Sequence, residues 1–410
     1  EEVGSEEIKN EGEFEKDTEN FLKKAETYPA YNSTFLGHTL DRSKVETITL
    51  LNKKEVPENA IDSWDVSDAG NESIMAYLLD EDNNGLYELY IGQNGGINLN
   101  ADASYLFCNF KNATSIKGIE KLDTSHVVNM GSMFCYCNSL VELDLNSWNT
   151  SKVTDMSLMF YMGIESSVKS ALTKLSISKF DTSNVTTMDR IFAGLIQLTS
   201  LDLSGFNTSN VTDVHGMFQQ CRLLESLNLS HFDTSKVTEM HYMFSTCRAL
   251  TNLDISHFDT SNVTNMIGMF ESCVNLSELD VRHFNTSNVT NMARMFFYCS
   301  KLTSLDLSGF NMDKVTNTMG MFFCCSELTT VNKNLSSATQ MDDMFFGCSK
   351  LTANITIGLN NCTGYSNMFK NAATASGAKI IVYYISSTSS LVTRMIATKS
   401  ENSNVVKVQI

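Results

Sequence analysis

The 410-residue sequence contains only two prolines and two tryptophans, and its basic residues are outnumbered by acidic ones. It has 30 lysines and arginines against 47 aspartates and glutamates, a formal net charge of −17. Phosphate contacts need a basic surface, so nucleic-acid binding is disfavoured. No stretch approaches the roughly 18 consecutive apolar residues of a membrane span, so we expect no membrane insertion by this chain. The scarcity of proline argues against a long extended linker.

The sequence is dominated by one repeated motif. The dipeptide Met-Phe, or Ile-Phe once, recurs mostly every 26 residues, with one step of 32 and two final steps of 23 and 24. The copies begin at Met133, Met159, Ile191, Met217, Met243, Met269, Met295, Met321, Met344 and Met368, and Leu106-Phe107 marks a first coil. A period in the twenties over this many copies is typical of a solenoid of stacked coils.

The coil from Leu198 to Leu224 predicts the structure of one repeat. Leucines alternate with polar residues in "LDLS" (201–204), which favours a strand. The following "FNTSN" (206–210) is rich in turn-forming side chains. Val214, Met217, Phe218 and Cys221 then recur at i, i+3, i+4 and i+7, the apolar face of a short helix. The sequence therefore predicts an α/β repeat solenoid, leucine-rich-repeat-like, with one short parallel strand and one short helix per coil.

The ends of the chain break this period. Residues 1–30 hold ten acids and four lysines and are predicted to be an acidic disordered or stalk segment. Residues 31–105 are predicted to be a β-rich N-terminal capping module, in which "DEDNNG" (80–85) joins two strands. The repeats occupy 106–372. Residues 373–410 lack Met-Phe and are predicted to form a C-terminal β cap, because the end faces of a solenoid need cover.

The repeat string L-x-x-L-D-L-S-x-F-[ND]-T-S-x-V-T-x-M-x-x-M-F-x-x-C resembles that of the BspA-like bacterial surface proteins with leucine-rich repeats. The flanking stretches "LDRSKVETITL" (40–50) and "KIIVYYISSTSS" (379–390) also resemble the ends of that family. The resemblance implies an extracellular, surface-displayed protein with a role in adhesion or host contact. One position departs from ordinary leucine-rich repeats: an aromatic residue, such as Phe206, stands where a buried asparagine is usual.

Two columns of polar side chains are the candidate binding face. The outward stripe of the predicted strands carries one acid or amide per coil, namely Asp202, Asn228, Asp254, Asp280 and Asp306. Before the aromatic residue of three consecutive coils stand His231, His257 and His283. Stacking would bring these imidazoles close together, where a metal ion or a pH response is conceivable. Other coils place serine, lysine or glycine there, which favours a tolerant exposed position.

The sequence contains none of the common catalytic motifs considered below. No phosphate-binding loop, nucleophile elbow or zinc-binding HExxH motif occurs, so no catalytic residue, cofactor or metal site is predicted.

Seven of the eleven cysteines share one repeat position, the inner face of the coil, which favours buried free thiols over disulfides. Asp80, Asp82 and Asn84 begin an EF-hand-like spacing, but Ile91 stands where the last ligand should be, which favours a plain hairpin.

The sequence therefore predicts a non-catalytic extracellular protein that presents its repeats to a protein or glycan ligand on a host or neighbouring cell. Two alternatives stay open. The repeats could be a structural spacer in a longer surface protein, or a module that binds a cation or glycan through the aspartate stripe.

Overall fold

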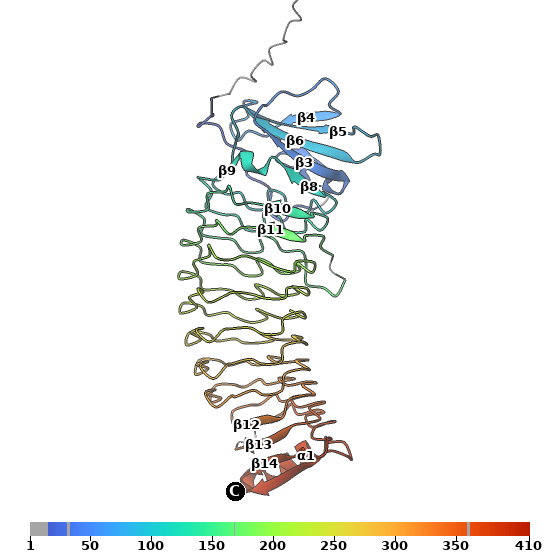
Figure 1. Ribbon diagram of the computed structural model, residues 1–410, viewed down its shortest axis with the longest axis vertical. Coiled ribbons are helices and arrows are strands. Elements are labelled where there is room, and N and C mark those ends of the chain that lie inside the picture. The colour runs from blue at the N-terminus through green and yellow to red at the C-terminus, as the bar shows by residue number, and fades with distance from the viewer. Residues whose placement is uncertain (1–14, 31–32, 168, 359–360) are drawn as a thin grey trace, which may run out of the picture.

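The structure, a computed structural model, describes residues 15–30, 33–167, 169–358 and 361–410. Its coils stack along one long axis, with the N-terminal module at one end and a small parallel sheet at the other (Figure 1). Residues 1–14 of the predicted acidic segment lie outside the described part. None of the described helices combines the length and apolar character needed to cross a bilayer.

The N-terminal module is built around a five-stranded sheet of order β4-β5-β6-β3-β8. Its strands are β3 (Val45–Leu51), β4 (Asp62–Asp65), β5 (Ile74–Leu79), β6 (Tyr87–Gln93) and β8 (Ser115–Lys117). β5 and β6 pair antiparallel across "DEDNNG", which is the predicted hairpin. β3 pairs in parallel with β8, and since β8 belongs to the first coils, the module is continuous with the stack. Shorter elements complete this end: β1 (Thr34–Phe35), β2 (His38–Thr39), η1 (Arg42–Lys44), β7 (Ile97–Asn98), η2 (Ile119–Lys121) and β9 (Leu122–Asp123).

The opposite end carries a four-stranded parallel sheet of order β12-β13-β14-β15. The strands are β12 (Thr330–Asn334), β13 (Thr352–Ile357), β14 (Ile380–Tyr384) and β15 (Val405–Gln409). Between β14 and β15 lie the turn η3 (Ser386–Thr388) and the helix α1 (Ser389–Ile396), where the sequence predicted only strands. α1 buries Leu391, Val392 and Met395.

The predicted helix in each coil is wrong, and with it the α/β fold class. The one α-helix among the described residues is α1; sheet and irregular backbone make up the rest. The eight residues with the pattern M-x-x-M-F-x-x-C instead form a series of tight turns, which we call the turn ribbon, numbered from 1 to 8. In Val214–Cys221 the backbone N–H groups of positions 4, 6 and 8 bond the carbonyl three residues earlier, at 3.0–3.1 Å. Those of positions 1, 3, 5 and 7 bond carbonyls of the next coil, at 2.8–3.1 Å.

The backbone N–H groups of the ribbon are divided between the same coil and the next coil, and this explains why the i, i+3, i+4, i+7 spacing of apolar residues wrongly predicted a helix. In a helix, each N–H beyond the first turn bonds a carbonyl of the same segment, whereas the ribbon uses alternate N–H groups to join neighbouring coils. From Met188 onward, positions 3 and 7 of every ribbon have positive φ, for example Arg190 at 48° and Gln220 at 65°. The left-handed residues reverse the chain so that positions 1, 4, 5 and 8 face inward. Apolar residues at i, i+3, i+4 and i+7 therefore arise here from consecutive turns.

The predicted strand of each coil is present only near the ends of the stack. β10 (Glu142–Asp144) and β11 (Lys174–Ser176) pair in parallel, and the next strand is β12. Residues 177–329, all of them described, contain no assigned strand. Phe180 and Phe206, beside these segments, have ring centroids 6.3 Å apart, against 5.7 Å for Phe218 and Phe244 in the ribbon. The coils therefore fan apart on the strand side and close up on the ribbon side.

The core is a continuous column of position-5 phenylalanines. Consecutive rings from Phe107 to Phe369 stack with centroids 5.5–6.0 Å apart, and all are buried. Beside them the position-8 cysteines donate their thiols to a phenylalanine carbonyl of the preceding coil; Cys247 Sγ, for example, lies 3.2 Å from the oxygen of Phe218. All eleven cysteines are free.

A ladder of buried threonines ties the coils together at the "[ND]TS" turns. Thr208 Oγ1 donates to the backbone oxygen of Asp233 at 2.9 Å and accepts its N–H at 2.8 Å. The same bonds repeat from coil to coil along the "[ND]TS" turns, at Thr150, Thr182, Thr208 and Thr286. One hydroxyl thus pairs both the backbone N–H and the backbone C=O of one residue in the next coil, which the turn would otherwise leave unpaired.

Candidate binding faces

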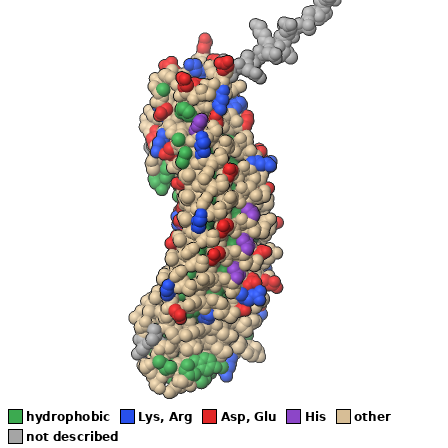
Figure 2. Space-filling model, turned by 90° about the vertical axis from the view of Figure 1, so that its left-hand side faces the viewer, with side chains coloured by type: hydrophobic (Ala, Val, Ile, Leu, Met, Phe, Trp, Pro, Cys, Tyr) green, Lys and Arg blue, Asp and Glu red, His purple; other side chains and the backbone are tan. Residues whose placement is uncertain are grey.

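The predicted aspartate stripe lies on the outward side of the coils, on a surface that we call the strand face. It carries one exposed side chain per coil: Asp202, Asn228, Asp254, Asp280 and Asp306. Each accepts the backbone N–H of the residue two positions later, at 2.8–3.2 Å. The side chains therefore form local turns and still present their remaining oxygens to solvent. Figure 2 shows acidic side chains spread along the stack and histidines gathered along one edge below its middle.

A hollow of about 610 Å³ opens in the strand face. Asp254, Glu278, Asp280, Arg282 and Asp306 are among its lining residues, together with leucines of three coils. The coils that line it belong to residues 177–329, where no strand is assigned. Four carboxylates against one guanidinium make the hollow acidic.

Hydrogen bonds favour the ionised form of the three aspartates in the hollow. Arg282 donates from Nε to Oδ1 of Asp280 at 3.0 Å and from Nη2 to Oδ2 at 2.7 Å. These bonds lower the pKa of Asp280 to about 2. Hydrogen bonds from Ser256 and Ser308 lower the pKa values of Asp254 and Asp306 in the same way. The hollow is consequently negative throughout the physiological range.

The three histidines of the predicted column are exposed and remain separate. His231, His257 and His283 each lie edge-on to the phenylalanine that follows, with centroids 5.0–5.2 Å apart. The structure brings no two of these three rings into contact, although all lie in its described part. His231 Nε2 instead lies 2.8 Å from the backbone oxygen of Leu203.

A different pair of histidines is brought together, and the sequence analysis missed it. His215 and His241 occupy ribbon position 2 of adjacent coils, and their rings stack with centroids 4.4 Å apart. His215 Nδ1 lies 2.7 Å from Asp213, and its Nε2 lies 3.8 Å from Asp189. His241 Nδ1 lies 3.1 Å from Glu239. The sequence could have indicated this pair, because His215 and His241 are 26 residues apart, which is one repeat.

The electrostatics of this pair are unlike those of the strand face. Burial, and then the neighbouring His215, lower the pKa of His241. Burial opposes ionisation of Asp213, but hydrogen bonds from His215 outweigh it and lower the pKa of this carboxyl. Burial raises the pKa of Asp189. The cluster is therefore a half-buried network of acids around imidazoles.

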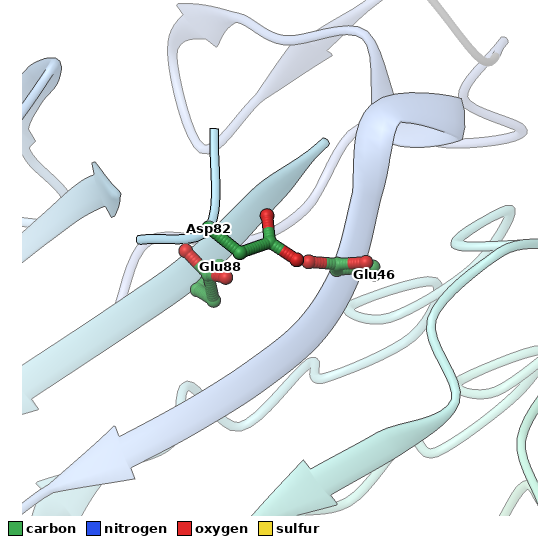
Figure 3. A group of neighbouring side chains, drawn as sticks. All are labelled: Glu46, Asp82 and Glu88. Atoms are coloured by element: carbon green, nitrogen blue, oxygen red, sulfur yellow. The ribbon is translucent and has the colours of Figure 1, made fainter. Parts of the chain in front are cut away.

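Three carboxylates of the N-terminal module converge beside the hairpin (Figure 3). Glu46 of β3, Asp82 of the connecting loop and Glu88 of β6 each offer an oxygen within 4.8 Å of the others. Hard cations such as Ca²⁺ prefer oxygen sets of this kind, so these are the described residues best placed to hold one. The "DEDNNG" loop supplies only Asp82 to the group. Asn84 turns its amide nitrogen toward Glu46, 3.3 Å from Oε2.

Stacked coils of near-constant length, joined by backbone bonds between equivalent residues, define this chain as a repeat protein. It belongs to the family described as "Mycoplasma protein of unknown function, DUF285", which matches residues 101–165, 166–252, 218–334, 248–358, 279–382 and 306–406. These overlapping matches extend over the coils and the C-terminal sheet. A search of the curated proteins gave no match. The comparisons do not identify the chain with the BspA-like surface proteins.

Proposed function

We propose that this chain is a non-catalytic extracellular protein, displayed at a cell surface, that binds a protein of a host or neighbouring cell through its strand face. The observation that carries the proposal is the acidic hollow lined by Asp254, Glu278, Asp280 and Asp306. The sequence resemblance to BspA-like surface proteins supports the extracellular setting.

The chemistry of the hollow favours a cationic partner. Hydrogen bonds lower the pKa values of Asp254, Asp280 and Asp306 below the ordinary value of 3.8, so these three carboxylates are ionised at neutral pH. Lysine and arginine side chains would find charge-assisted hydrogen bonds there, with bidentate geometry for arginine. The leucines of the lining, such as Leu227, offer apolar contact for the aliphatic stems of the same side chains.

The scaffold beneath the hollow suits recognition of an extended segment. The threonine ladder and the turn ribbon fix the register of successive coils, so side chains on the strand face recur at a constant step. Binding to such a face is spread over several coils and strengthened by long-range attraction. We therefore expect affinity to fall as ionic strength rises.

The experiment is binding of the full chain to an array of host-cell and matrix proteins, with Asp254→Lys/Asp306→Lys as the test variant. Its matched control is Asp144→Lys/Asp202→Lys, which changes the same charge on the same face outside the hollow. Binding that is lost only in the test variant, with both variants folded, supports the proposal. Equal binding by both variants contradicts it. Binding that survives deletion of the two coils around the hollow supports the spacer alternative instead.

A further inference from the structure

The outward side of the turn ribbon carries a second surface, distinct from the strand face. Ribbon position 6 points outward, and in five successive coils it holds Glu271, Phe297, Phe323, Phe346 and Lys370. The backbone bonds between these ribbons fix the coils in register, for example Tyr298 N to Phe323 O at 2.7 Å and Cys324 N to Phe346 O at 2.7 Å. Three phenylalanines are thus framed by an acid on one side and a base on the other.

The three rings form a short aromatic ladder. Phe297 and Phe323 stack with centroids 4.5 Å apart, and Phe323 and Phe346 with centroids 4.6 Å apart. Arg294 lies over the free face of Phe297 at 3.8 Å, and Lys370 lies 5.7 Å from the ring of Phe346. Because neighbouring rings and cations cover the ring faces, the ladder presents ring edges outward.

Large apolar side chains beside the ladder are exposed. Tyr298 is 44 % exposed and Met319 is 39 % exposed, while Phe297, Phe323 and Phe346 are half-buried. Tyrosine, arginine and phenylalanine gathered on a rigid surface are typical of protein interfaces. The sequence analysis missed this cluster because only stacking places these residues side by side.

We propose that this surface binds a second copy of the same chain, in an antiparallel dimer whose two-fold axis passes over the coil of Phe323. Such an axis lies in the plane of the interface and across the stack. It reverses the order of the coils but keeps each ribbon position opposite itself. The proposal is independent of the strand face and of the function assigned to it.

The charges of the ribbon match this arrangement at two positions. At position 6, Glu271 lies two coils before Phe323 and Lys370 two coils after it, so each faces its opposite charge on the second copy. At position 3, Arg294 lies one coil before and Asp343 one coil after, and these also meet. Since Glu271 already bonds Arg294 within one copy, Nε to Oε2 at 3.2 Å, the four groups alternate in sign across the interface.

The shapes at position 7 match as well. Tyr298, exposed and bulky, faces Gly347 of the second copy, where no side chain stands. Cys324 lies on the axis coil and faces its own equivalent. A parallel dimer offers no such match, because it would set each coil against the same coil and leave Glu271 and Lys370 without opposite charges. The register of charges and volumes therefore selects the antiparallel form.

The first test is sedimentation of the full chain over a concentration series, beside Phe323→Glu. Two glutamates would face each other across the axis, so we expect this variant to remain monomeric while the parent chain forms dimers. Phe323 is half-buried, so the circular dichroism and melting of the variant are checked first. A parent chain that stays monomeric at every concentration, or a folded variant that dimerises equally well, overturns the proposal.

The second test uses two charged side chains of ribbon position 6, the exposed Lys370 and the partly buried Glu271. Glu271→Lys sets like charges against Lys370 of the second copy, and Lys370→Glu sets like charges against Glu271. Each variant alone should raise the dimer dissociation constant by about tenfold or more. Mixed together, they should form a heterodimer as tight as the parent dimer, because both contacts then pair opposite charges. Failure of the mixture to associate contradicts the antiparallel register.

A third measurement locates the axis. A short bis-maleimide should link two chains through Cys324, which is of intermediate exposure while the other ten cysteines are buried. Cys324→Ser should abolish the linked product in denaturing gels. A product that persists in this variant, or its absence at concentrations where the parent sediments as a dimer, contradicts the proposed axis.

Discussion

The imidazole rings of His215 and His241 are stacked, with an angle of 8° between the ring planes and 4.4 Å between the ring centroids. Two protonated rings could not share this spacing without strong repulsion. Around them stand Asp189, Asp213 and Glu239, the acids that bond or approach the two rings. The pair is therefore sensitive to the number of protons that it holds.

The pair predicts an acid-sensitive contribution to stability. Burial and His215 lower the pKa of His241 in the folded chain below its ordinary value of 6.5. The stabilising contribution is therefore complete above pH 6.5 and is lost as the pH falls toward the folded pKa. We expect the stability advantage of the parent chain over His241→Gln to shrink between about pH 8 and about pH 5. Urea unfolding at several pH values measures it, with the exposed His257→Gln as control. An advantage that does not change with pH contradicts the prediction.

The turn ribbon predicts opposite effects of glycine at neighbouring positions. Ser272 occupies position 7 with φ of 59°, where a side chain is strained. Ser272→Gly should stabilise the chain by about 0.5 kcal/mol. Ser245, at position 6 and without positive φ, should lose about 0.5–1 kcal/mol on the same change. Thermal melting of the two variants decides the matter. Destabilisation by both would fit a helix and not the ribbon.

The threonine ladder predicts a costly loss of one hydroxyl. Thr208→Val keeps the shape of the side chain but leaves the backbone N–H and C=O of Asp233 unpaired. Because Thr208 is buried, we expect a loss of about 2 kcal/mol. Thr212→Val is the matched control, since Thr212 is exposed and makes one bond to Thr186; its cost should stay near 0.5 kcal/mol or below. Equal urea midpoints for both variants would contradict the prediction that the ladder threonines stabilise the fold more than exposed threonines do.

We predict one reactive thiol, that of Cys324 beside the cysteine column. Burial raises the pKa values of Cys247, Cys299 and Cys325 well above the ordinary value of 9.0 and also raises that of Cys324, but Cys324 alone is partly exposed to a reagent while the other ten cysteines are buried. In dilute folded protein a thiol-specific chromogenic disulfide should react quickly with Cys324 alone, and in denaturant with all eleven cysteines. Cys324→Ser removes the fast reaction. Several fast thiols in the folded parent chain would show that the column is open.

Much of the arrangement could be predicted from the sequence because identical inward residues must stack on one another. The 26-residue step located the Met-Phe column, and alternation around "DEDNNG" located the hairpin of β5 and β6. The acid stripe, with Asp254 and Asp280, also followed from alternation within the coil. What failed was local conformation: the spacing of Val214, Met217, Phe218 and Cys221 fits both a helix and a series of turns, and periodicity alone does not separate them.

The sequence by itself determined the repeat, its length and the side chains that face inward, since a periodic core leaves a periodic record. Only the tertiary structure decided which backbone groups pair between coils, and hence that turns replace helices and that the strand side fans open. It also decided which outward residues meet, such as His215 with His241 and Phe297 with Phe323. The physical reason is that hydrogen bonds and surface contacts between coils join residues a whole repeat apart, and the packing of neighbouring coils selects among the local conformations that one coil allows.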